Sequence, residues 1–351
     1  MLKNYYSNDL YPIITASEFD DDDKKTAANV FSKCHMALLY YIIIMTIAII
    51  VIDLVLQLVY PEDTYMSIIM HPTFSPALQI VSMYFIAFPF YCIFLRKVPK
   101  ASREKSTIPL CEFISLASIS IAVMQLGSIV AELAKRYISS SLQLPYAIEM
   151  TNSLLQAFDV VPTLIWVIII GPIFEELIFR KVMIDRLSVY GDRLAVIVSS
   201  VAFGLFHGNL TQFIYTTLAG FFFGHAYTKT RRLIYPIGLH MLANLFGTLP
   251  TVLYYIEFNA TQEDIVDVEA IFNGGITLTY IMFWLKIVLI AWGIVMFVFS
   301  FFMKKYRLSK LCDIEIPKLK LLRVVVFNKG TILFFVYSVL NIVLTFLELG
   351  Q

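Results

Sequence analysis

The residues of this chain best suited to chemistry form the run GPIFEELIFR at residues 171–180, at the end of a long apolar stretch. An ionised carboxylate costs several kcal/mol to bury in hydrocarbon, so a glutamate pair and an arginine there need a partner or a function. On a helix, Glu176 and Arg180 share one face, with the acid before the base, which is the favourable order. Glu175 points about 100° away from Glu176 and has no partner nearby in the sequence. The pattern predicts a Glu176–Arg180 ion pair and leaves Glu175 free to react.

Two further polar clusters lie inside apolar stretches downstream of Glu175. His207 ends the run FGLFH that begins at Phe203, and His240 and Asn244 are four residues apart on one helix face. A single histidine of this kind is more often a packing residue, but three polar clusters on consecutive helices can face one cavity. One carboxylate, two imidazoles and one carboxamide are enough to activate a water molecule and to stabilise an oxyanion.

Two other interpretations are compatible with these residues alone. In the first, the charged side chains form a buried ion network that holds helices together. In the second, isolated charges within apolar stretches at Asp53, Asp159 and Lys286 mark the path of an ion or a substrate. The protein would then be a transporter or a non-catalytic membrane protein that binds a peptide.

The three motifs, in this order, resemble those of the CPBP (Abi) family, the CAAX-processing and bacteriocin-processing intramembrane endopeptidases, in their bacterial type. The motifs are EExxxR at residues 175–180, FxxxH at 203–207 and HxxxN at 240–244. The resemblance covers about residues 155–250. It implies hydrolysis of a peptide bond in a membrane-associated peptide or protein, without a covalent intermediate; the alternative within this resemblance is a non-catalytic bacteriocin-immunity or transport-type protein.

The resemblance also implies a role for each matching residue. Glu175 would activate the water, and His207 would hold that water together with it. His240 and Asn244 would stabilise the carbonyl oxygen as it becomes an oxyanion. The supporting residues would be Glu176, Arg180 and Phe203.

No cofactor is favoured, but zinc is an alternative. The sequence has no HExxH motif, which places two histidines one turn apart on a metalloprotease helix. A distributed set of Glu175, His207 and His240 could still supply three zinc ligands and leave a fourth position open. Direct activation of water by Glu175 is preferred, because Asn244 is a poor zinc ligand and a good oxyanion donor.

Composition places the chain among membrane proteins with several spans. Of its 351 residues, 59% are hydrophobic and only 15% are charged, whereas charged residues make up about 25% of a typical soluble domain. No basic groove with interleaved aromatic residues is visible, so no nucleic-acid partner is expected. The 4 cysteines have neither zinc-ribbon nor disulfide-framework spacing.

Nine segments are candidates for membrane spans, each of which needs about 20 mostly apolar residues. They are residues 36–59, 74–95, 108–131, 153–179, 194–208, 210–228, 233–255, 276–303 and 331–349. The third segment is rich in serine, which favours helix packing over lipid contact. We therefore expect an all-α polytopic membrane protein whose site lies in a cavity formed by the fourth to seventh spans.

The distribution of lysine and arginine predicts the orientation. With the N-terminus inside, all 27 basic residues except Lys135, Arg136 and Lys286 fall on the cytoplasmic side. This pattern predicts a multi-pass protein of the cell membrane with a cytoplasmic N-terminus and an outer C-terminus.

We expect two parts, a polar cytoplasmic segment at residues 1–35 and a single membrane domain at 36–351. The membrane domain contains the motif-bearing core, an acidic outer loop at 256–275 and a basic inner loop at 304–330. The expected partners are the lipid bilayer and a membrane-associated peptide or protein substrate.

Overall fold

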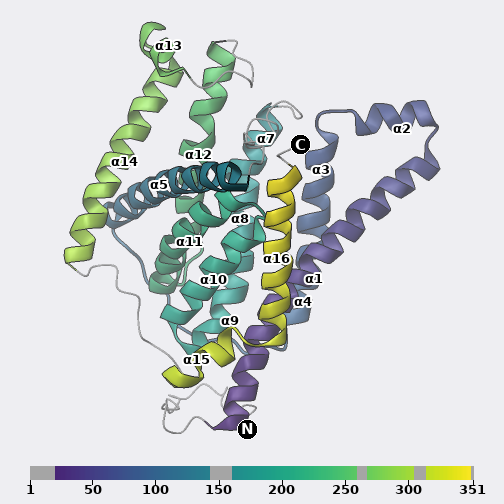
Figure 1. Cartoon of the computed structure of the whole chain (residues 1–351), viewed down its shortest axis with the longest axis vertical. Coiled ribbons are helices and arrows are strands. Elements are labelled where there is room, and N and C mark those ends of the chain that lie inside the picture. The colour runs from purple at the N-terminus through teal and green to yellow at the C-terminus, as the bar shows by residue number, and fades with distance from the viewer. Residues whose placement is uncertain (1–19, 143–159, 259–266, 304–313, 349–351) are drawn as a thin grey trace.

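Helices make up nearly all of the structure, a computed structural model (Figure 1). It describes residues 20–142, 160–258, 267–303 and 314–348. No β-strand occurs within these ranges, so the predicted all-α class is confirmed. The beginning of the predicted span 153–179, including Asp159, lies outside the described residues.

The helices follow one another in three groups. The first group is α1 (Asp21–Val59), α2 (Glu62–Ile69), α3 (Phe74–Ile80), the π-helix η2 (Val81–Ala87), α4 (Phe88–Leu95) and α5 (Leu110–Leu142). The second is α7 (Val160–Ile165), the π-helix η3 (Trp166–Ile170), α8 (Gly171–Glu176), the π-helix η4 (Leu177–Ile184), α9 (Asp185–Leu187) and the short 3₁₀ helix η5 (Ser188–Tyr190). The third is α10 (Asp192–Phe206), α11 (Leu210–Thr230), α12 (Ile234–Glu257), α13 (Val268–Asn273), α14 (Leu278–Phe302), α15 (Lys318–Val325) and α16 (Lys329–Glu348).

The polytopic membrane architecture is confirmed, whereas the count of nine spans stays a prediction. Seven helices of the described chain are long and apolar enough to cross a membrane. They are α1, α3–η2–α4, α5, α7–η5, α12, α14 and α16. The other two predicted spans correspond to α10, which has 15 residues, and α11, which has 21.

The first helix contains the predicted span at residues 36–59 and begins before it. It starts at Asp21 rather than near residue 36, because Asp20 and Asp23 form a capping box at its N-terminus. The backbone N–H of Asp23 donates to the side chain of Asp20 at 2.7 Å, and the acidic first turn also suits the positive end of the helix dipole. The later part of the segment predicted to be polar, including the buried residues Cys34 and His35, is thus helical.

The segment with the glutamate pair is one helical stretch of 31 residues, Val160–Tyr190, interrupted by two π-helical sections. These sections, η3 and η4, lie directly before and after α8. π-helical turns are rare and occur often at functional sites, because the extra residue per turn shifts the side chains that follow. Glu175 and Glu176 therefore lie in a short α-helical section. The π-helical sections on either side of it influence the direction in which their side chains point.

Small residues allow the helices around this segment to pack closely. A Cβ atom at Gly204 of α10 would lie 2.7 Å from the carbonyl oxygen of Phe213 on α11, and one at Gly293 of α14 would lie 2.1 Å from that of Ser118 on α5. Ser118 is fully buried. The serine-rich face of α5 is therefore a packing face, as the sequence predicts, and α5 crosses the other helices (Figure 1).

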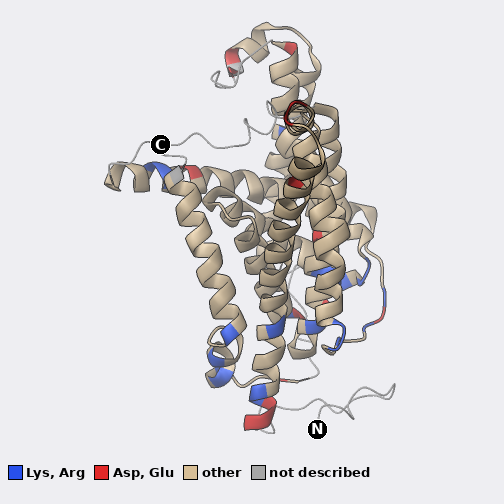
Figure 2. Cartoon of the chain, turned by 90° about the vertical axis from the view of Figure 1, so that its right-hand side faces the viewer, with Lys and Arg blue, Asp and Glu red and all other residues tan. Residues whose placement is uncertain are grey.

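Charged residues are distributed unevenly along the molecule (Figure 2). Lysine and arginine gather toward the end at which α1 begins, where the acidic first turn of α1 also lies, and acidic residues mark the opposite end around α13. This agrees with the asymmetry in the sequence. The orientation in the membrane stays a prediction.

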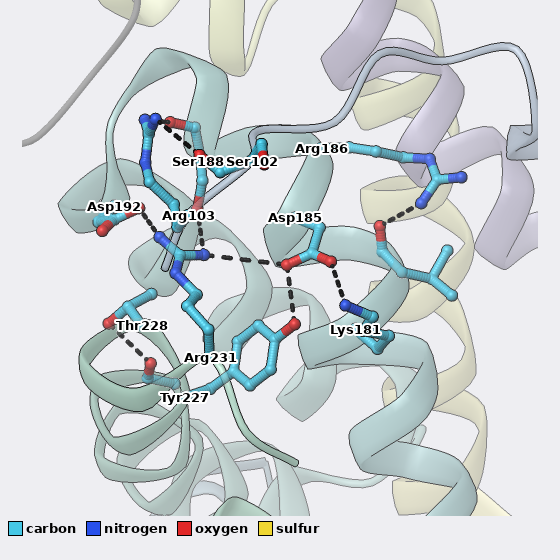
Figure 3. A network of polar contacts seen from close by, with 12 residues as sticks. Ser102, Arg103, Lys181, Asp185, Arg186, Ser188, Asp192, Tyr227, Thr228 and Arg231 are labelled. Carbon is cyan, nitrogen blue, oxygen red and sulfur yellow. Dashed lines mark hydrogen bonds and ion pairs between the residues drawn. The ribbon is translucent and has the colours of Figure 1, made fainter. Parts of the chain in front are cut away.

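An ion network, buried except for Lys181 of η4, joins α9, α10 and the end of α11 (Figure 3). Arg231 pairs with Asp192 and lies 3.8 Å from Asp185, which accepts a hydrogen bond from the hydroxyl of Tyr227 at 2.8 Å. Lys181 Nζ lies 2.9 Å from the second oxygen of Asp185. Every charge in this network has an opposite charge beside it. These residues are therefore well explained as an ion network that holds helices together.

Candidate active site

The predicted ion pair between Glu176 and Arg180 is present and completely buried. Oε2 of Glu176 lies 2.8 Å from Nε of Arg180, and both side chains are 0% exposed. The guanidinium carbon of Arg180 also lies 4.8 Å from the ring centroid of Phe203 and 5.7 Å from that of Phe223. Aromatic faces attract a cation, so the buried ring of Phe203 helps to stabilise the arginine.

The other oxygen of Glu176 contacts His240, which is 64 residues away in the sequence. Nδ1 of His240 donates a hydrogen bond to Oε1 of Glu176 at 3.0 Å. The imidazole also stacks on the ring of Phe223, with centroids 5.0 Å apart, and meets the edge of Phe203 at 5.6 Å. Three neighbours therefore fix the plane of the His240 ring.

Glu175 occupies a different environment from Glu176, as the helical geometry predicts. Its side chain is 20% exposed, and its Oε2 lies 3.6 Å from Nε2 of His240. His240 thus lies between the two glutamates, with Nδ1 toward the buried Glu176 and Nε2 toward the accessible Glu175. A carboxylate that is accessible to water and close to an imidazole is suited to act as a general base.

His207 follows the last residue of α10, at the turn into α11. Its Nδ1 lies 2.8 Å from the carbonyl oxygen of Phe203, so Nδ1 is the donor and Nε2 is left available. The ring meets the edge of Phe203 at 4.9 Å. The next residue, Gly208, has φ of +71°, a conformation that favours glycine and lets the chain turn sharply after the histidine.

Asn244 is anchored to the π-helical section before the glutamates. Its Nδ2 donates to the carbonyl oxygen of Val167 at 2.8 Å. A carboxamide nitrogen has two N–H groups, and this contact uses one of them. The other N–H remains available to a ligand.

A cavity of about 860 Å³ brings the four predicted catalytic residues together. Glu175, His207, His240 and Asn244 all line it. Its walls come from α7–α8 and from α10, α11 and α12, as predicted, and also from α5, α14 and α16. Helices outside the predicted fourth to seventh spans therefore also form walls of the cavity.

Comparison with known proteins agrees with the motifs. Residues 157–246 match the family described as type II CAAX prenyl endopeptidase Rce1-like. Over 182 residues the chain is 32% identical to the putative membrane peptidase YdiL of Bacillus subtilis (strain 168), covering 50% of this chain and 72% of that protein. The chain belongs to the CPBP, or Rce1-like, family of membrane peptidases. This matched segment contains all three motifs of the peptidase.

A second relative of the peptidase is the membrane-embedded CAAX protease MroQ of Staphylococcus aureus (strain USA300). The two chains are 40% identical over 88 residues, which is 23% of this chain and 36% of that protein. No solved structure matches the peptidase significantly.

The two histidines of the peptidase have the chemistry of zinc ligands, but the candidate ligands are not gathered around one point. Histidines that bind metals usually donate the other ring N–H to a carboxylate or a backbone carbonyl, as His240 and His207 do here. However, no group of three or more His, Cys, Asp or Glu within the described ranges is placed to hold a metal ion. The donor chemistry of Glu175, His207 and His240 fits zinc, and their placement does not.

The contribution of α5 to the cavity was not predicted from the sequence. Gln125, Ser128, Glu132 and Arg136 of this helix line the cavity. They follow one another at intervals of three and four residues, which places them on one helix face. This spacing of polar residues in an apolar segment is the feature of the sequence that could have indicated that α5 lines the cavity.

Proposed function

We propose that this membrane peptidase hydrolyses a peptide bond with a water molecule that Glu175 activates. The observation that carries the proposal is the position of His240 between two carboxylates. Its Nδ1 is held by the buried Glu176, while its Nε2 lies 3.6 Å from Glu175 on the cavity wall. A candidate general base and a candidate hydrogen-bond donor for the oxyanion are thus next to each other on the wall of the cavity.

In the proposed reaction, Glu175 and His207 hold the water between them. Glu175 accepts a proton as the water oxygen attacks the carbonyl carbon, and the carbonyl oxygen becomes an oxyanion. In its protonated form His240 offers Nε2–H to that oxyanion, and Asn244 offers its second N–H. Glu175 then passes the proton to the leaving amine, the C–N bond breaks, and no covalent enzyme intermediate forms.

We propose a membrane-associated peptide or protein as the substrate. Five of the seven apolar helices supply walls of the cavity, which supports a site in or beside the bilayer, where such a chain is already concentrated. The two relatives are named as a membrane peptidase and as a CAAX protease, in agreement with a substrate of this kind.

A zinc-dependent variant of the same hydrolysis is the second candidate. It is favoured by the two histidines, whose Nδ1 atoms are both occupied by protein acceptors so that Nε2 remains available.

The test is Glu175→Gln in the purified full-length chain, reconstituted in liposomes with internally quenched apolar peptides as probes. The change keeps the size of the side chain and removes the base, so kcat should fall at least about a hundredfold. The melting temperature in detergent should stay within about a degree of wild type. Glu62→Gln, at an exposed glutamate outside the cavity, is the matched control and should cleave normally.

Retained cleavage in Glu175→Gln would contradict the proposal. A wild-type protein that binds the peptides without cleaving them would instead support the non-catalytic, peptide-binding interpretation.

A further inference from the structure

The cavity wall includes a positively charged side chain that has no role in the proposed reaction. Lys286 of α14 lines the same cavity as Glu175 and His240. It is the only charged residue among the 25 residues of α14, and it is partly buried. A lysine inside an apolar helix is costly in a membrane, and residues of this kind usually face a cavity and mark a substrate path.

Lys286 has no opposite charge beside it among the residues that the structure describes. The other charged residues of this part of the wall, Glu132 and Arg136, belong to α5. Glu132 lies 2.9 Å from Lys135 and 3.6 Å from Arg136, so its negative charge is already engaged. The charge of Lys286 is therefore available to a molecule in the cavity.

The level of Lys286 in the bundle follows from the contact between α12 and α14. Glu257, the last residue of α12, accepts hydrogen bonds from the backbone N–H groups of Leu278 and Thr279 at 3.1 Å and 3.0 Å. The end of α12 thus lies beside the start of α14. Lys286 is eight residues after Leu278, and Thr248 is nine residues before Glu257, so the two side chains that line the cavity are nearly level.

This level gives the offset along the axis of α12 between Lys286 and the proposed catalytic centre. Thr248 is eight residues after His240 on α12, which is about 12 Å along the helix axis. An extended peptide that runs parallel to α12 advances about 3.3–3.6 Å per residue, so this axial offset corresponds to about four residues of bound substrate.

We propose that Lys286 forms an anion-binding subsite that pairs with a carboxylate of the bound peptide, about four residues from the cleaved bond. The carboxylate is either an acidic side chain or the free C-terminus of the peptide. A lipid headgroup is disfavoured because Lys286 lies about 12 Å along α14 from its first residue, within the apolar part of the helix. The subsite rests on the proposed function, since it assumes that the cavity holds a peptide.

The experiment uses the full-length chain in detergent and fluorescent apolar peptides in matched versions. One pair differs only in a free or an amidated C-terminus. A second, amidated series places Asp or Asn three, four or five residues on either side of the central bond. Binding is measured by fluorescence anisotropy in a Glu175→Gln background, and cleavage of the same peptides is measured with Glu175 intact.

We expect one carboxylate version to bind about tenfold to about a hundredfold more tightly than its neutral partner, as a charge-assisted hydrogen bond allows. Lys286→Gln should remove this difference. Lys286→Glu should reverse it, so that a peptide with Lys in place of Asp binds better. Lys97→Gln, at an exposed lysine outside the cavity, is the control and should keep the wild-type preference.

Equal binding of the charged and neutral peptides would overturn the subsite, as would a preference that persists in Lys286→Glu, or no binding of any peptide. A Lys286-dependent preference without cleavage by the wild type would support the subsite while contradicting the proposed hydrolysis. Cleavage of the peptides without a preference for the carboxylate version would support the proposed hydrolysis and contradict the subsite.

Discussion

Oε1 of Glu176 accepts a hydrogen bond from Nδ1 of His240 at 3.0 Å, joining the first and third sequence motifs in the interior of the protein. The second oxygen of the same carboxylate pairs with Arg180. Glu176 therefore has two functions that the sequence did not separate. It neutralises a buried cation, and it sets the orientation of the histidine proposed to stabilise the oxyanion.

Glu176→Gln should lower stability, because it leaves Arg180 without its counter-ion at a site with 0% exposure. Removing one partner of a buried ion pair costs about 3–5 kcal/mol. We expect a clear fall in the melting temperature in detergent, accompanied by a loss of activity.

The double variant Glu176→Gln, Arg180→Met separates stability from positioning. Replacing both charges should recover much of the melting temperature. Activity should remain low, because the carboxylate that accepts from His240 is still absent. Full recovery of activity in the double variant would show that Glu176 serves Arg180 alone.

Asn244→Ala should reduce kcat by about a hundredfold to a thousandfold, the usual cost of losing one oxyanion donor. KM should change little, because the second N–H is proposed to act on the transition state. Kinetics with the quenched peptides measure both constants. An increase confined to KM would assign Asn244 to peptide binding instead.

Chelation should leave the cleavage rate unchanged if Glu175 activates water without a metal. The measurement compares wild type before and after dialysis against a strong chelator, with Glu175→Gln as the inactive control. A loss of activity that added zinc restores would favour the zinc-dependent variant and contradict the preferred mechanism.

Gly293→Ala should destabilise the contact between α14 and α5, because the new Cβ would lie 2.1 Å from the carbonyl oxygen of Ser118. Overpacking of this kind costs about 1–3 kcal/mol. Gly247→Ala is the matched control, since a Cβ there meets nothing within 4 Å. Thermal unfolding in detergent should show a lower melting temperature for the first variant only, and equal temperatures would contradict the close packing.

Accessibility labelling of single cysteines in a cysteine-free background tests the predicted orientation. A cysteine in the acidic loop at 256–275 should react with an impermeant reagent added to intact cells, and one in the loop at 304–330 should not. The opposite labelling pattern would reverse the predicted topology.

The sequence by itself determined the helical class, the membrane setting and the Glu176–Arg180 pair. Each depends on composition or on spacing within one helix, where about 3.6 residues per turn fixes which side chains are neighbours. The same geometry separated Glu175 from Glu176 and placed His240 and Asn244 on one face. The resemblance of the ordered motifs then indicated the family, which the comparisons confirm.

Only the tertiary structure decided which helices meet. The contact of Glu176 with His240, the anchoring of Asn244 to Val167 and the participation of α5 and Lys286 in the cavity all join distant parts of the chain. These contacts depend on how the helices cross and on where small residues such as Gly293 permit close approach. Spacing along one helix contains no information about crossing angles between helices, so the cavity and its charged wall could not be derived from the sequence.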